Sequence, residues 1–171
     1  MGFYYFDADV QVKYYLPEPG STWVRQIVDE VDSEGRPLHV LFSAEISLVE
    51  VAAAFAVIHR AGRIGRKLRD DIFNKYMKGM TSRYQFVPLT SDLLHNGAHL
   101  TQQYPLKGYD AVQLAAAMAL KVALDRYGLA MIFVSGDRQL LNAAQAEGLT
   151  TDSPFNHVNL NNVRRTNLTR E

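Results

Sequence analysis

The sequence contains no cysteine and no excess of either charge, and both absences narrow what the protein can be. Without thiols it has no disulfide framework, thiolate zinc site, iron–sulfur cluster or cysteine nucleophile, which fits a cytoplasmic protein. Its 18 basic residues equal its 18 acidic residues, so the formal net charge is +0 at pH 7. Binding to nucleic acid or to an anionic membrane would therefore depend on a local basic patch.

Long apolar runs are missing as well. The longest weakly charged stretch, residues 46–58, contains Glu50 and is too short to cross a bilayer, which takes about 20 apolar residues. No basic leader followed by an apolar segment precedes Asp7. We expect a soluble protein that is not exported.

The 171 residues, 47% of them hydrophobic, suffice for one globular domain. A chain of this length buries about 70% of its unfolded surface on folding, and such a composition excludes intrinsic disorder. We expect residues 1–150 to form the domain. Residues 151–171 are rich in Asn, show little apolar periodicity and are expected to be a C-terminal surface tail.

Short apolar runs alternate with helix-length segments along the chain. Strands are predicted at residues 3–6, 38–42, 84–89 and 131–135, and helices at residues 10–15, 21–35, 43–60, 66–80, 91–103, 110–127 and 137–147. This alternation predicts a three-layer α/β/α domain with a central parallel sheet of four or five strands. Ligands in such domains bind beyond the carboxyl ends of the strands, near the place where the strand order reverses.

Four acidic residues stand at positions that a structural role alone does not readily explain. Asp7 ends the first predicted strand and Asp137 follows the fourth, so both should project from one edge of the sheet. Glu50 is the only charge in residues 46–58, and Asp110 is the only charge in residues 108–120. No equally isolated set of Lys or Arg lies among these elements, so we predict that Mg²⁺ or Mn²⁺ balances the four acids.

Each acid also has a structural interpretation. Asp110 and Asp137 could each cap the helix that follows, and residues 47–50 match a capping box, although that helix is expected to begin earlier. Asp9 is most simply the cap of the first short helix. Asp7 has the weakest structural explanation, because nothing in the strand requires a carboxylate at its end.

Four segments of the chain carry recognisable motifs. They are residues 6–21 with their Pro-Glu-Pro-Gly turn, residues 43–51, residues 109–115 (Tyr-Asp-Ala-Val-Gln-Leu-Ala), and residues 133–141 followed by Ala-Glu-Gly-Leu at 146–149. In this order they resemble the motifs of PIN-domain proteins of the VapC toxin type. The resemblance covers about residues 3–150.

The resemblance implies a metal-dependent endoribonuclease that is the toxin of a type II toxin–antitoxin system of the VapBC kind. The implied site contains four Mg²⁺- or Mn²⁺-binding acids and a nearby hydroxyl: Asp7, Glu50, Asp110, Asp137 and Ser135. Asp9 departs from the family pattern, which more often has Ser, Thr or Asn there, and it is a secondary candidate ligand. Such toxins usually form homodimers and are inhibited by a small antitoxin that covers the site.

The chemistry expected of this site is metal-assisted hydrolysis of RNA without a covalent enzyme intermediate. A bound divalent ion lowers the pKa of water and compensates the charge that builds on the phosphoryl oxygens. In the absence of metal, acids packed together repel one another, so at least one of them should have a raised pKa.

Surface features suggest less. The basic segment at residues 59–69, a helix–turn–helix hairpin, could lie along an RNA backbone or be a solvated turn. Four apolar residues at its end and in the following turns could form either core or a partner groove: Leu68, Ile72, Phe73 and Tyr76. The pair His95 and His99 is expected to lie on the surface, and no metal is assigned to it.

Two other functional classes stay open. Asp7-Ala8-Asp9 after an apolar strand also resembles the nucleophile motif of haloacid-dehalogenase-type phosphatases, in which the first Asp is phosphorylated and the second is the general acid and base. That class needs a further acid shortly after Asp137, and residues 138–142 contain none. The remaining class is a binding module that uses the fold to hold RNA or protein without catalysis.

Overall fold

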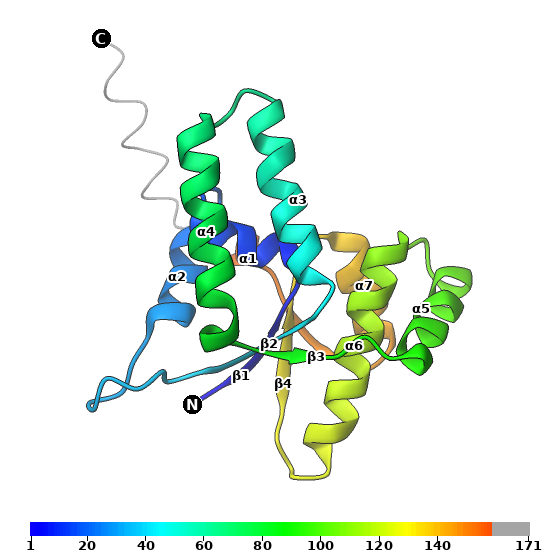
Figure 1. Ribbon diagram of the computed structural model, residues 1–171. Helices are drawn as coiled ribbons and strands as arrows, with labels where there is room; N and C mark the ends of the chain where they lie inside the picture. The colour runs from blue at the N-terminus through cyan, green and yellow to red at the C-terminus, as the bar shows by residue number, and fades with distance from the viewer. Residues whose placement is uncertain (159–171) are drawn as a thin grey trace.

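The computed structural model describes residues 1–158. In these residues five parallel strands form a central sheet and seven α-helices surround it (Figure 1). The strands are β1 (Phe3–Phe6), β2 (Val40–Ala44), β3 (Tyr84–Val87), β4 (Met131–Val134) and β5 (Thr150–Asp152). The helices are α1 (Ala8–Tyr15), α2 (Ser21–Asp29), α3 (Ser47–Arg60), α4 (Arg66–Arg83), α5 (Ser91–Gln103), α6 (Gly108–Asp125), α7 (Arg138–Ala146) and the 3₁₀ helix η1 (Pro154–His157). The predicted α/β/α class with a parallel sheet is confirmed.

The strand order is β3-β2-β1-β4-β5, so the first strand lies at the centre. Tyr5 is in register with Phe42 of β2 on one side and with Phe133 of β4 on the other. The chain builds β2 and β3 on one side of β1 and then returns to build β4 and β5 on the other. The strand order therefore reverses between β1 and β4, and a ligand site is expected beyond their carboxyl ends.

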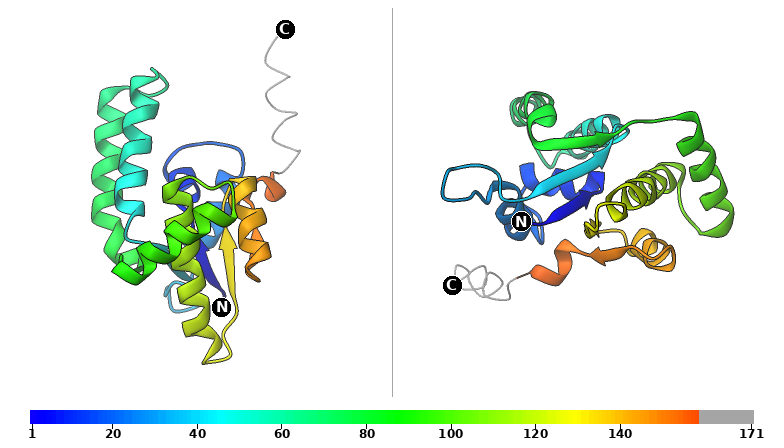
Figure 2. Two further views of the ribbon diagram at one scale, coloured as in Figure 1. Left: turned by 90° about the vertical axis from the view of Figure 1, so that its right-hand side faces the viewer. Right: turned by 90° about the horizontal axis from the view of Figure 1, so that it is seen from below.

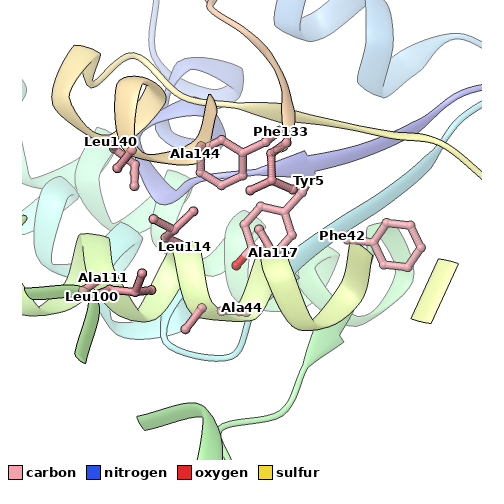
Figure 3. Close-up of a cluster of buried hydrophobic side chains, with 14 of the residues drawn as sticks. Tyr5, Phe42, Ala44, Leu100, Ala111, Leu114, Ala117, Phe133, Leu140 and Ala144 are labelled. Carbon is pink, nitrogen blue, oxygen red and sulfur yellow. The ribbon is translucent and has the colours of Figure 1, made fainter. Parts of the chain in front are cut away.

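Alternate residues of the central strands bury opposite faces of the sheet. Tyr5 stacks on Phe133 with ring centroids 5.4 Å apart, and both pack against Leu114 of α6 and Leu140 of α7 (Figure 3). The neighbouring residue Phe6 faces the other way, in a cluster that includes residues of α2. Helices α6 and α7 therefore cover one face of the sheet and α2 covers the other.

Helices α3 and α4 form an antiparallel hairpin that stands beside the sheet (Figure 2). Its base packs on α1 through a third apolar cluster, in which Phe55 and Tyr76 meet edge to face with centroids 6.0 Å apart. Both residues are fully buried. The hairpin is thus held to the domain at the end of α3 that carries Glu50.

Several element boundaries differ from the sequence prediction. Strand β2 extends through Ser43 and Ala44, which lie in register with Phe86 and Val87 of β3, so α3 begins at Ser47 rather than at residue 43. Helix α2 ends at Asp29 instead of near residue 35. In both places the local pattern predicts a helix, but the residues pair with another segment instead: Ser43 and Ala44 pair with β3, and Val31 forms a bridge with Pro37.

The chain continues as ordered structure past residue 150. Strand β5 pairs with β4, and η1 packs back onto α2, where the rings of Trp23 and His157 stack with centroids 4.0 Å apart. The part of the predicted surface tail at residues 159–171 lies outside the described residues. None of the helices in residues 1–158 combines the length and the apolar character needed to cross a membrane.

Candidate functional site

Asp7 lies directly after β1 and is nearly fully buried, with 6% of its surface exposed. It caps α1, because its Oδ1 accepts the Ala8 N–H at 2.6 Å, and its Oδ2 accepts the Ser135 hydroxyl at 2.8 Å. A structural role for this carboxylate therefore exists, contrary to the sequence-based expectation. The acid that caps α1 is Asp7 and not Asp9.

Ser135 and Asp137 follow β4, and Ser135 contacts Asp7 from the neighbouring strand. The fully buried Ser135 hydroxyl donates to Asp7 and accepts the Asp137 N–H at 3.0 Å. Asp137 caps α7, with its Oδ1 accepting the N–H groups of Gln139 and Leu140. The structure thus brings Asp7, Ser135 and Asp137 together at the reversal of strand order.

Asp9 lies inside α1, and its carboxylate reaches the loop after β4. Both of its oxygens accept the Gly136 N–H, at 3.0 and 3.2 Å. A Cβ atom added to Gly136 would collide with the Asp9 carboxylate and would lie 3.1 Å from Phe155 Cε2. Asp9 is therefore committed to fixing the Gly136 loop, and Gly136 is the residue that leaves room for it.

Glu50 and Asp110 approach the same edge of the sheet from α3 and α6. Glu50 is in the first turn of α3, but its Oε2 accepts Gln113 Nε2 at 2.6 Å, so the side chain reaches α6 instead of forming the capping box. Asp110 is the third residue of α6, whose N-cap is Lys107. The interpretation of Asp110 as an N-cap is therefore wrong, and both acids are half-buried.

The acids influence one another's ionisation. Burial raises the pKa of Asp7 well above its ordinary value, and the charge of Asp9 raises it further. Burial also raises the pKa of Asp9, of Glu50 and of Asp110, with the charge of Asp110 adding to the effect on Glu50 and the charge of Asp137 adding to that on Asp110. These mutual effects show that carboxylates distant in the sequence are neighbours in space, in surroundings that favour their neutral forms.

Two buried polar residues that the sequence analysis did not include complete the site. Lys13 is 5% exposed, pairs with Glu18 at 3.2 Å and lowers the pKa of Asp9, against the larger effect of burial. Gln113 is fully buried and binds Glu50. A signal for Gln113 exists in the sequence, since it is the only polar side chain in the apolar run after Asp110.

The donor set consists of hydroxyl and carboxylate oxygens, which suits Mg²⁺ or Mn²⁺ better than zinc. In residues 1–158 no three His, Asp or Glu side chains stand close enough to ligate one ion in their present positions. Asp7 and Asp9 have both oxygens bound to protein donors. The chemistry and the clustering of the acids fit a hard cation, while a closed cage would require the carboxylates to move inward.

The remaining candidate features lie on the α3–α4 hairpin and on α5. Arg63 pairs with Glu18, and both Arg66 and Arg69 pair with Asp70, so part of the basic segment is neutralised. Of the four apolar residues predicted as core or partner groove, Ile72 and Tyr76 are buried, whereas Leu68 and Phe73 are 46% and 39% exposed. The two α5 histidines, His95 and His99, are exposed.

The fit between Asp9 and Gly136 yields a prediction about stability. Replacing Gly136 by Ala should expel the Asp9 carboxylate from its hydrogen bonds and cost about 2 kcal/mol of unfolding free energy. The backbone of Gly136 is not in the left-handed region, so the cost comes from the collision and not from backbone strain. Urea denaturation monitored by circular dichroism measures it.

The matched test removes the carboxylate. In an Asp9→Ser background the collision with the carboxylate is gone and only the contact with the exposed Phe155 ring remains, so Gly136→Ala should cost less than about 1 kcal/mol. Gly65→Ala is the control, because a Cβ at Gly65 meets nothing within 4 Å. Equal costs for Gly136→Ala with Asp9 and with Ser at position 9 would refute the assignment.

Comparison with known proteins finds relatives in one class. Two curated proteins of Mycobacterium tuberculosis, named Ribonuclease VapC45 (strain CDC 1551 / Oshkosh) and Ribonuclease VapC49 (strain H37Rv), are each 27% identical over 144 residues, which is 84% of this chain and 90% of the relative. A solved toxin–antitoxin complex from Klebsiella pneumoniae aligns with a TM-score of 0.47 at 14% identity, over 88% of this chain and 96% of that one. No protein-family profile matches. The resemblance to VapC-type proteins that the motifs indicate is confirmed by the two relatives.

Proposed function

We propose that this VapC-like PIN protein is a metal-dependent endoribonuclease that hydrolyses RNA phosphodiester bonds. The observation that carries the proposal is that Asp7, Glu50 and Asp110, which come from the end of β1, from α3 and from α6, have pKa values raised by burial and by neighbouring acids. Burial and neighbouring negative charges destabilise the ionised form of a carboxylate, and a bound cation compensates for both effects. The names of the two relatives support the same activity.

Four acids would hold the metal: Asp7, Glu50, Asp110 and Asp137. When bound, Mg²⁺ or Mn²⁺ supplies a lowered pKa for water and compensation of charge on the phosphoryl group. The Ser135 hydroxyl orients the Asp7 carboxylate, because its hydrogen is already donated to Asp7 Oδ2. Asp9 fixes the Gly136 loop on which Asp137 is carried and would be at most a secondary ligand.

We further propose that the enzyme acts in the cytoplasm as the toxin of a type II toxin–antitoxin pair. The relatives' names support this class. Exposed apolar side chains on α4, among them Leu68, Phe73 and Met77, offer a surface for a small antitoxin or for a second copy in a homodimer. A short neighbouring reading frame whose product co-purifies with this chain and blocks cleavage would support the proposal.

The geometry disfavours the phosphatase alternative. In that chemistry Asp9 would donate and accept a proton at the substrate, yet both of its oxygens bind the Gly136 N–H. Asp7, the required nucleophile, is buried and caps α1. A binding module without catalysis would not need the raised pKa values of Asp7, Glu50 and Asp110, and an activity assay separates it from the nuclease.

Addition of Mn²⁺ is expected to produce two linked effects in the same range of concentration. Cleavage of a fluorescently labelled single-stranded RNA should appear, and the melting temperature should rise, because an ion that binds only the folded state stabilises it by about 2.7 kcal/mol at a concentration of 100 times its Kd. Excess EDTA should reverse both effects.

Two Asp→Asn variants provide the comparison. Asp110→Asn should lose most of the metal-induced rise in melting temperature together with cleavage. Asp92→Asn replaces an exposed acid in the first turn of α5 and should retain both. RNA cleavage that persists in EDTA, or an Asp110→Asn protein that responds fully to Mn²⁺, would contradict the proposed function.

A further inference from the structure

We propose that a hollow beside the acids, bounded by Phe155 and the Gly136 loop, is a subsite for one unpaired base of the RNA strand. The inference rests on the proposed nuclease function and adds to it a site that selects single-stranded substrate. The base would belong to a nucleotide flanking the phosphate at the acidic cluster.

The hollow adjoins the loop that carries Asp137, because residues on both sides of Asp137 line it. It has a volume of about 330 Å³, and its lining includes Gly136, Arg138, Leu141, Gln145 and Phe155. Gly136 is the residue that Asp9 fixes, and Arg138 directly follows Asp137. A nucleotide that flanks a phosphate at the acids would place its base in the hollow across the loop that carries Asp137.

Phe155 supplies a stacking surface at this place. Its side chain is 49% exposed although it is a large apolar residue. The buried ammonium group of Lys13 lies 4.6 Å from the ring centroid, and the cap of η1 holds the backbone, with Ser153 Oγ accepting the Phe155 N–H at 3.4 Å. An exposed aromatic ring that is held in position is the feature on which proteins stack unpaired bases.

Polar groups of the hollow suit the edge of a base and a phosphate. Asn156 donates its amide N–H to Asp152 Oδ1 at 3.1 Å. Burial favours the neutral form of Asp152, but hydrogen bonds from His157 and Asn156 outweigh it and lower the pKa of Asp152, so this carboxylate only accepts. The Asn156 carbonyl oxygen is consequently directed away from Asp152 and can accept an exocyclic amino group, while the exposed Arg138 can meet a phosphate.

The position of the hollow also argues for RNA over another occupant. It lies at the carboxyl ends of β4 and β5, against the loop that carries Asp137, and combines an aromatic ring, amides and one arginine. A single-stranded nucleic acid offers base, sugar and phosphate at matching spacing. The proposal would be overturned if a peptide bound in this hollow and single-stranded RNA did not.

Binding of short single-stranded RNA tests the subsite. Fluorescence anisotropy is measured with Mg²⁺ in an Asp7→Asn background, which prevents cleavage. Phe155→Leu should weaken binding about tenfold, because one base stacked on an aromatic side chain contributes about 1–3 kcal/mol. Phe155→Trp should keep the affinity, and Tyr127→Leu, which replaces a 79% exposed aromatic residue in the turn after α6, should not change it.

Changing the RNA instead of the protein provides a second test, and its first step uses the protein with Phe155 in place. Abasic nucleotides are placed one at a time along the oligonucleotide. With Phe155 present, one position should lose about tenfold in affinity, and in the Phe155→Leu variant the same abasic position should cost nothing further. Cytosine at that position should bind better than uracil, because only cytosine presents an amino group there.

The outcomes separate this inference from the proposed function. If the unsubstituted protein with Mn²⁺ does not cleave RNA, the nuclease proposal fails. If it cleaves RNA but neither Phe155→Leu nor any abasic position changes the affinity, the nuclease stands and the subsite is refuted. Coincident loss in both arms supports the subsite.

Discussion

Asn in place of Asp7 is expected to abolish RNA cleavage while leaving the fold at least as stable as that of the unsubstituted protein. Burial holds the pKa of Asp7 well above its ordinary value, so the charged carboxylate costs stability at neutral pH. Asn can still accept the Ala8 N–H and can turn its amide toward Ser135. The rate of Mn²⁺-dependent cleavage should fall by about 10³-fold or more, because a neutral amide ligates a hard cation weakly.

The raised pKa of Asp7 determines how the stability difference between the two proteins should change with pH. The pKa of Asp7 is raised in the folded state and is near 3.9 in the unfolded chain, so the unfolded chain loses its proton first as the pH rises. The contribution of this group to stability is complete below the unfolded pKa and is lost as the pH rises through the folded pKa. Asp7→Asn should therefore gain stability relative to the unsubstituted protein between about pH 4 and neutral pH.

Urea denaturation in EDTA at about pH 4.5 and about pH 7.5 measures the gain. The difference between the two proteins should favour the Asp7→Asn variant at both pH values and should be smaller at the lower pH than at the higher pH, and Mn²⁺ should reduce it. Asp125→Asn is the control, because Asp125 pairs with Lys121 on the surface and should change stability by less than about 1 kcal/mol at either pH. A protein destabilised by Asp7→Asn at neutral pH would show that the carboxylate is mainly a structural cap.

The fold was predictable because the strands are buried on both faces and read as short apolar runs. The element boundaries were not predictable where the local sequence suits both a strand and a helix, or suits neither. Ser43 and Ala44 continue an apolar run into the next helix, and only their pairing with β3 makes them a strand. Strand β5 has the sequence Thr-Thr-Asp, which carries no apolar signal, and it forms because β4 offers it a free edge.

The acids of the site were predictable as isolated charges on apolar elements, but their individual contacts were not. Asp9 illustrates the limit, since a cap and a ligand were the available interpretations and the structure instead uses it to bind Gly136, 127 positions away. The same holds for the bond between Tyr5 and Gln113, which are separated by 108 positions. Such contacts depend on how distant helices pack, which no local pattern encodes.

Replacing Gln113 by Leu is expected to give the largest loss of stability among these variants. Gln113 lies fully buried in α6, where its Oε1 accepts the Tyr5 hydroxyl at 2.7 Å and its Nε2 donates to Ser47 Oγ at 2.8 Å and to Glu50 Oε2 at 2.6 Å. Figure 3 shows the Tyr5 hydroxyl directed toward α6. Among the side chains that the structure describes, every buried nitrogen and oxygen has a hydrogen-bond partner, so no spare group is present to replace Gln113.

Leucine fits the apolar surroundings of this part of α6 but offers no polar group. It would leave the fully buried Tyr5 hydroxyl without an acceptor and deprive Ser47 and Glu50 of a donor. Each unsatisfied buried group costs about 1–3 kcal/mol, so the unfolding free energy should fall by about 3 kcal/mol or more. That is a large share of the roughly 5–15 kcal/mol by which a domain is typically stable, so the midpoint of urea unfolding should shift clearly.

Gln102→Leu is the matched control, because Gln102 is an exposed glutamine in α5 whose amide donates only to the adjacent Thr101 in the described contacts. Its effect should stay within about 0.5 kcal/mol. Tyr5→Phe removes the hydroxyl that Gln113 accepts, so in that background Gln113→Leu should cost less than it does alone. If the two substitutions instead add independently, or if Gln113→Leu costs less than about 1 kcal/mol, the network does not hold Glu50 and α6 in place.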